Sequence, residues 1–203
     1  MTIEKYWSFG SNPYWVYTFH FGEEGTEYHV RCTDVTLAGI IDALGTFAIP
    51  VDEFGGFIEQ LSENGVDLSG EEILDLAKSN TIKSINAYDV SPSVNIFYLA
   101  GQPLWLDAAT RQQLRISIEA YQAQGETTVT KWFGGEQYSF PTSLWLTMLN
   151  ALEVYAGDAL NATERHKATV ASLDSLEDVL SYDYTTGYPE ILNLTPQWLQ
   201  QHI

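Results

Sequence analysis

Two histidines, His20 and His29, are the residues whose types and spacing best suit shared chemistry. Each lies in a segment of alternating apolar and polar residues, over 14–21 and 27–33, and a glycine-containing turn separates the two segments. If the apolar faces match in a hairpin, His20 lies opposite His29 on the polar face. Such a pair can bind zinc or nickel, or respond to pH. A metal site needs a third ligand, for which only Glu27 or a distant carboxylate is available, so we expect no metal and two solvated imidazoles.

Other catalytic signatures are absent from the sequence. It contains no dinucleotide-binding glycine loop, no P-loop, no His-Glu-x-x-His helix and no Gly-x-Ser-x-Gly elbow. With 27 acidic residues some carboxylate pair always exists, so such a pair is no glycosidase signature. Asp107, four residues before Arg111, is expected to be a helix N-cap, and His166 lies on an apolar helical stripe. We therefore predict no catalytic residue, no cofactor and no enzymatic activity.

The charge of the chain argues against two classes of partner. Its formal charge is −18, from 27 acidic and 9 basic residues. Such a surface repels phosphate backbones and anionic lipids, so we expect neither nucleic acid nor a membrane as partner. Cys32 is the only cysteine, which excludes an internal disulfide, and its strand pattern predicts a buried thiol. We also expect no signal peptide and no membrane span, because no basic start precedes an apolar run and no apolar run approaches the required ~20 residues.

Residues 1–87 are predicted to form a small N-terminal module built on a β-hairpin over 14–33. The register that matches its apolar faces pairs Phe21 with Tyr28, Phe19 with Val30 and Tyr17 with Cys32. Short helices are expected over 36–47, 53–64 and 69–79. A capping box of Ser69 and Glu72 starts the last of them, and a third short strand over 81–87 is expected to follow.

Residues 88–203 are predicted to form a second domain of two hairpins and long helices, which makes the protein α+β. The first hairpin spans 94–106 around Ala100-Gly101, and the second spans 127–140 around Gly134-Gly135. The expected pairs are Ile96 with Trp105, Phe97 with Leu104, Val129 with Phe140 and Lys131 with Tyr138. A helix capped by Asp107 separates the hairpins, and a long helix follows the second. Gly157 either interrupts the long helix or is tolerated in it for close packing.

Both faces of the first hairpin are partly apolar, so the hairpin must be covered on both sides, by its own domain or by a neighbouring subunit. We expect the two hairpins to lie at or near an interface with another copy of the chain or a fixed partner. The expected interface residues are Ile96, Phe97, Leu104, Trp105, Trp132 and Tyr138. An alternative use of these aromatic side chains is a sugar-binding platform.

Several short motifs between about residues 85 and 194 occur in an order that resembles an uncharacterised domain family of tailed phages and prophages. They include Val94-Asn95-Ile96-Phe97, the stretch from Trp105 to Arg111, Thr130 to Gly135, Ala151 to Ala156, Asn161 to His166, and Tyr182 to Pro189. Members occur near the C-termini of tail-associated proteins. The family has no established activity, so the resemblance implies a context and not a reaction.

We therefore expect a structural or assembly component of a tailed-phage virion, in the tail, baseplate or fibre attachment. Its expected partners are itself, as a homo-oligomer, and other virion proteins. It would be made in the bacterial host cytoplasm and reside in the particle. The alternatives are a tail-fibre assembly chaperone and a module that binds glycans of the host surface.

Overall fold

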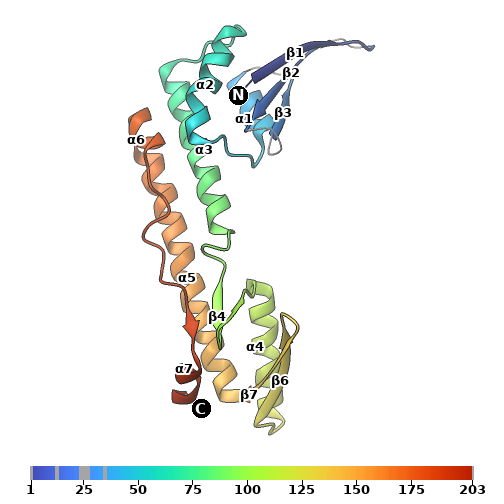
Figure 1. Cartoon of the computed structure of the whole chain (residues 1–203), viewed down its shortest axis with the longest axis vertical. Coiled ribbons are helices and arrows are strands. Elements are labelled where there is room, and N and C mark those ends of the chain that lie inside the picture. The colour runs from blue at the N-terminus through green and yellow to red at the C-terminus, as the bar shows by residue number, and fades with distance from the viewer. Residues whose placement is uncertain (1, 12–13, 23–27, 34–35, 203) are drawn as a thin grey trace. The chain divides into compact units, whose positions relative to one another are not determined.

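The protein has an α+β fold, as the sequence predicts, in a computed structural model that describes residues 2–11, 14–22, 28–33 and 36–202 (Figure 1). The chain divides into two compact units. Unit 1 comprises Met1–Asn86 and His166–Tyr184, and unit 2 comprises Ala87–Arg165 and Thr185–Ile203.

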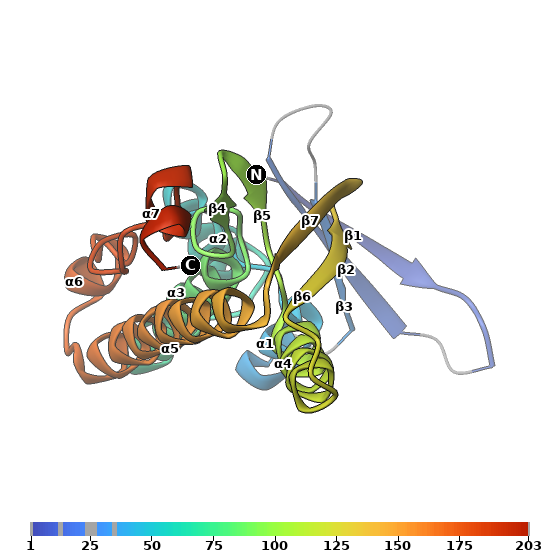
Figure 2. The same cartoon turned by 90° about the horizontal axis from the view of Figure 1, so that it is seen from below.

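Unit 1 contains a three-stranded antiparallel sheet in the order β1-β2-β3, formed by Thr2–Ser8, Tyr14–Phe21 and Tyr28–Cys32. The predicted register of the 14–33 hairpin is confirmed, including His20 opposite His29. The first strand was not predicted, although its residues pair with β2 from Thr2 opposite His20 to Ser8 opposite Tyr14. Figures 1 and 2 show the β1–β2 ribbon reaching beyond β3 and α1 (Leu37–Leu44).

One face of this sheet packs on the helices of unit 1. Phe19 and Phe21 on β2 contact the ring of Phe57, which lies on α2 (Val51–Glu63). The helix α3 (Gly70–Asp89) contributes Leu76, Ala77 and Ile85 to the same core. Cys32 is also buried there, as predicted.

The predicted strand over 81–87 is wrong, because α3 continues through it. The capping box is formed, since the Glu72 amide donates to Ser69 Oγ (3.2 Å) and the Ser69 amide donates to Glu72 Oε2 (2.8 Å). Beyond the predicted end, Asn80, Thr81 and Ile85 extend the buried face at helical spacing. Asn80 is accommodated because its side chain pairs with both backbone groups of Ile49, at 2.6 and 2.8 Å.

Unit 2 contains both predicted hairpins. In the first, β4 (Phe97–Leu99) pairs with β5 (Gln102–Leu104), with Phe97 opposite Leu104. The expected pairing of Ile96 with Trp105 lies beyond this ladder. In the second, β6 (Thr128–Phe133) pairs with β7 (Glu136–Pro141) in the predicted register. Both turns have two successive residues with positive φ, the geometry of a tight type I′ turn.

The long helices of unit 2 lie where the sequence predicts them. Asp107 caps α4 (Ala108–Ala123), because its Oδ1 accepts the Thr110 amide at 2.7 Å. The hairpin of β6 and β7 lies beside α4 (Figures 1 and 2). The long helix α5 (Thr142–Ser172) runs through Gly157 without interruption. A Cβ at Gly157 would meet no atom within 4 Å, so close packing does not require this glycine.

The C-terminal segment folds back onto unit 2. The short strand β8 (Asn193–Leu194) pairs in parallel with β4, so the strand order of this sheet is β5-β4-β8. It leads into α7 (Pro196–Gln201), where Leu199 is buried and Trp198 stacks on His202. Trp198 therefore lies partly buried against the core of unit 2.

The two units differ from the predicted modules, 1–87 and 88–203, in one segment. The first division falls within one residue of the expected boundary, but His166–Tyr184 belongs to unit 1. This segment contains the end of α5 and the short helix α6 (Leu176–Leu180). Val170 on α5 and Val179 on α6 are buried in the core of unit 1. His166 is buried as predicted and its Nδ1 lies 2.7 Å from the Tyr182 hydroxyl. Within the described residues, no helix is both long and apolar enough to cross a bilayer.

Candidate interaction surface

The outer part of the β1–β2 ribbon carries large aromatic side chains that unit 1 leaves uncovered. We call this region the aromatic end, and its residues are Tyr6, Trp7, Phe9, Tyr14 and Trp15. Trp7 and Trp15 lie on one face of the ribbon and Tyr6 and Tyr14 on the other. Each is exposed, and Phe9 retains 88% of its accessible surface. Aromatic residues gathered in this way are typical of surfaces that bind other proteins.

The strand register explains why Trp7 and Trp15 lie together. Trp7 lies opposite Trp15, and Lys5 lies opposite Tyr17. Since alternate residues share a face, these four residues continue the face on which Phe19 packs into the core. The helices of unit 1 cover Phe19 but not Trp7 and Trp15, so the apolar face extends beyond its own core.

Ring contacts order part of this surface. The Trp7 and Trp15 rings meet edge to face with centroids 4.9 Å apart. Lys5 Nζ lies 4.7 Å from the Trp15 ring centroid and 5.0 Å from that of Tyr17, within range of a cation–π interaction. Pre-ordered aromatic side chains lose little conformational entropy on binding, which favours their use as anchors at an interface.

The aromatic end is electrically neutral on a strongly acidic protein. Residues 2–22 include only Glu4 and Lys5 as formally charged side chains, whereas the whole chain has a net charge of −18. The electrostatic repulsion between this protein and another acidic protein is therefore weakest when the two meet at the aromatic end.

The sequence does contain a signal for the first strand, although its alternation is imperfect. Thr2–Ser8 is rich in β-branched and aromatic residues, and the sequence between it and β2 contains Gly10, Ser11 and Pro13, residue types that are frequent in turns. Lys5 interrupts the apolar positions of β1, so the period is visible only when β2 is placed beside it. Its cation–π contacts show how the lysine is accommodated on that face.

The structure brings His20 and His29 together as predicted. Their Nδ1 atoms lie 2.9 Å apart, and the rings are nearly perpendicular. His20 Nε2 also lies 3.6 Å from Oε2 of Glu4, which is on the adjacent strand β1. The predicted two-stranded hairpin did not include this neighbour. Glu27 lies outside the described residues. Among the residues that the structure describes, no group of three or more histidine, cysteine or acidic side chains could hold a metal.

The six predicted interface residues do not share one surface. Phe97 and Tyr138 are buried within unit 2, with 2% and 9% exposed, so their assignment to an interface is corrected. Ile96, Leu104 and Trp105 are half-buried, whereas Trp132 is 67% exposed on β6. Trp132 is therefore the member of the set whose ring is largely open to a partner.

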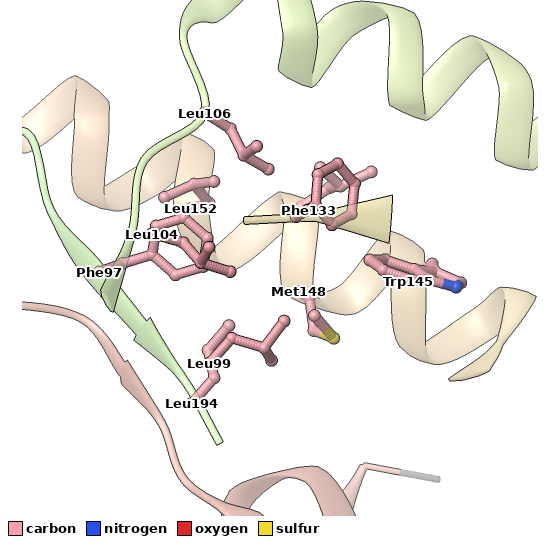
Figure 3. Close-up of a pocket in the computed structure, with 10 residues that line it drawn as sticks. Phe97, Leu99, Leu104, Leu106, Phe133, Trp145, Met148, Leu152 and Leu194 are labelled. Carbon is pink, nitrogen blue, oxygen red and sulfur yellow. The ribbon is translucent and has the colours of Figure 1, made fainter. Parts of the chain in front are cut away.

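The core of unit 2 explains this correction. Figure 3 shows Phe97, Leu99 and Leu194 converging with side chains of α5 and the second hairpin around a small cavity of about 20 Å³. Unit 2 therefore covers the apolar face of the first hairpin with its own residues. The cavity has room for about one water molecule and is lined by apolar residues, so it is a packing defect and not a ligand site.

Arg111 forms a polar cluster at the start of α4. It is buried, its Nε donates to Glu153 Oε1 at 2.9 Å, and its Nη1 donates to the Leu106 carbonyl at 2.7 Å. The guanidinium also lies 5.7 Å from the Trp105 ring centroid. The sequence predicts Asp107 as a cap but carries no local signal for the contact between Arg111 and Glu153, which joins α4 to α5.

Comparison with known proteins adds no assignment: no family model, no curated protein and no solved structure matches the chain.

Proposed function

We propose that the protein is a structural or assembly component of a tailed-phage particle and acts through protein–protein interfaces. The observation that carries the interface part is the aromatic end, an ordered and uncovered group of aromatic side chains. The resemblance of the motifs over residues 85–194 to a phage domain family supports the phage context. Tail, baseplate and fibre attachment are the proposed locations.

The aromatic end fits a partner surface that is apolar at its centre. Aromatic residues are enriched at protein interfaces, and a few of them supply most of the binding free energy. Partners of this kind are another copy of the chain or a neighbouring virion protein. Trp132, on the second hairpin, offers another exposed ring, so unit 2 can contribute a contact of its own.

Light scattering coupled to size exclusion tests the interface. The chain has a mass of 22.8 kDa, and we expect the purified protein to form a defined oligomer several times larger. The double substitution Trp7→Ala and Trp15→Ala should lower the oligomer mass, because it removes the centre of the aromatic end. The matched control is Ile116→Ala with Val154→Ala, which removes exposed aliphatic side chains in unit 2 and should leave the mass unchanged.

Mass spectrometry of purified particles tests the location. A virion component is present at a fixed ratio to the known tail proteins. An assembly chaperone, the second candidate, is present in infected cells and absent from mature particles. A stable monomer that is absent from both particles and assembly intermediates would contradict the proposal.

A further inference from the structure

Unit 2 also contains a pocket of about 300 Å³. Its walls come from the end of α3 and the following loop, from the Trp105 segment and the start of α4, and from the middle of α5. The polar and aromatic lining residues are Asp89, Asn95, Trp105, Asp107 and Arg111. Pockets of this volume lie at the lower end of those that bind small molecules.

The charged residues of the pocket are largely engaged with the protein itself. Arg111 is held by Glu153 and by the Leu106 carbonyl. Asp89 Oδ1 accepts from the Thr163 hydroxyl at 2.6 Å, and Asp107 Oδ1 accepts from the Thr110 amide at 2.7 Å. The guanidinium is thus matched by a carboxylate, and the Asp107 carboxyl is also hydrogen-bonded by the Thr110 hydroxyl and the Ala109 amide. Asp89 keeps its second oxygen outside the bond from Thr163. The pocket is therefore no receptor for a strong anion.

The groups that remain for a ligand include donors and acceptors. Within the described part of the chain, neither the side-chain amide of Asn95 nor the indole N–H of Trp105 makes a hydrogen bond to protein. Both can donate, and the side-chain carbonyl of Asn95 and the second oxygen of Asp89 can accept. A cation requires acceptors and an anion requires donors, whereas a hydroxyl group both donates and accepts.

Shape and polarity agree with this chemistry. Alanines at 108, 156 and 159 line the pocket and leave room for a ring-sized ligand. Trp105 lines the pocket with an aromatic ring, and the Arg111 guanidinium lies 5.7 Å from the centroid of that ring. An aromatic ring also attracts the C–H groups of a saturated ring. An aromatic ring beside mixed donors and acceptors matches a molecule with an apolar face and a rim of hydroxyl groups.

We propose that this pocket binds a neutral sugar ring, in contact with Trp105 and hydrogen-bonded by Asn95 and Asp89. The site is separate from the aromatic end, and it does not depend on the proposed virion role. It also differs from a platform of open aromatic rings such as Trp132, because its polar groups surround the ring and can select among hydroxyl configurations.

Titration followed by NMR of the tryptophan indole N–H signals tests the site on the full chain. The probes are the methyl glycosides of glucose, galactose and mannose, together with N-acetylglucosamine. Lysine amide and sodium phosphate serve as the cationic and anionic comparators. We expect at least one sugar to shift the Trp105 signal saturably, with a dissociation constant of about 1 mM or below, and neither comparator to do so.

Two variants test the geometry. Asn95→Ala should weaken sugar binding about tenfold or more while preserving the spectrum of the fold, because its side chain bonds to no described protein group. Ala156→Met should block the pocket by volume alone. Gln137→Ala, on exposed β7, is the control and should bind as the wild type does.

The proposal is overturned if none of the four sugars gives a saturable shift. It is equally overturned if only lysine amide or phosphate binds, or if Asn95→Ala and Ala156→Met, both folded, bind sugar as tightly as the control.

Discussion

Arg111 shows how one side chain can organise several parts of unit 2. Its side chain is 8% exposed, whereas that of its partner Glu153 is 46% exposed. Removing Arg111 and removing Glu153 are therefore expected to affect stability differently. Without Arg111, the Glu153 carboxylate can turn to water, but without Glu153 the guanidinium stays buried with its charge unmatched.

Glu153→Ala is expected to lower the free energy of unfolding by about 1–3 kcal/mol, because it leaves a buried charge unpaired. Glu119→Ala is the matched control. It removes an acidic neighbour of Arg115 that lies 3.9 Å away on the same helix and is 53% exposed, while Arg115 keeps its hydrogen bond to Asn150. The change in stability should be less than about 0.5 kcal/mol. Urea denaturation of both variants measures the difference, and equal losses would show that the Arg111 pair is no more important than a surface pair.

Asp107 predicts a dependence of stability on pH. The hydrogen bond from the Thr110 backbone amide holds the pKa of the Asp107 carboxyl below its ordinary value of 3.8. A carboxyl whose pKa is lower in the folded state than in the unfolded state stabilises the fold at neutral pH. That contribution is lost as the pH falls below 3.8 and through the lowered pKa.

Asp107→Ala should therefore be less stable than the wild type at pH 7. The difference between their free energies of unfolding, here called the gap, should become smaller in acid. Asp107→Asn keeps an accepting oxygen without the titration, so its stability should stay close to that of the wild type and above that of Asp107→Ala at all pH values. Urea denaturation at a series of pH values measures both gaps. A gap for Asp107→Ala that is the same at pH 7 and in acid would contradict the assignment.

At the scale of elements, two glycines differ in what they contribute to the stability of the helices in which or beside which they lie. Gly157 lies within α5, has no positive φ and has open space where a Cβ would stand. Gly125, just after α4, has a φ of +84° that suits the end of a helix. An added side chain is therefore compatible with the backbone at Gly157 but strained at Gly125.

Gly157→Ala is expected to raise the free energy of unfolding by up to about 1 kcal/mol, because alanine restricts the unfolded chain and favours the helix. Gly125→Ala should lower it by about 1 kcal/mol, because the left-handed conformation is strained for alanine. Thermal denaturation of the two variants checks the signs. A loss of stability in Gly157→Ala would mean that its helix face is occupied in the assembled protein.

At the scale of the whole molecule, the chain builds unit 1 from two distant segments. His166–Tyr184 supplies Val170 and Val179 to a core that otherwise comes from the first 86 residues. Lys78 Nζ also donates to the Ala171 carbonyl at 3.1 Å within this unit. A domain boundary drawn in the sequence alone therefore separates residues that fold together.

A fragment of residues 1–87 is expected not to fold cooperatively, because it lacks part of the core of unit 1. Near-ultraviolet circular dichroism and NMR dispersion of the fragment measure this. The full chain, in the same buffer, is the control and should show both a dispersed spectrum and a cooperative transition. A cooperative transition of the fragment alone would contradict this account of unit 1.

The sequence by itself determined the parts of the structure that depend on neighbouring residues. Alternation and tight turns specified three hairpin registers, including His20 opposite His29, because a shift by one residue would exchange the two faces of a strand. Caps specified where α3 and α4 begin, because the Ser69 and Asp107 side chains bond to amides three residues on.

Only the tertiary structure decided which apolar surfaces are covered and which stay open. Phe97 lies in the core because β8, from the far end of the chain, pairs with β4, and no local period encodes such a contact. The same holds for the pocket beside Trp105, whose walls come from three separate segments. Trp7 and Trp15 stay exposed for the converse reason: their strands are specified locally, but the helices of unit 1 cover only the inner part of the sheet.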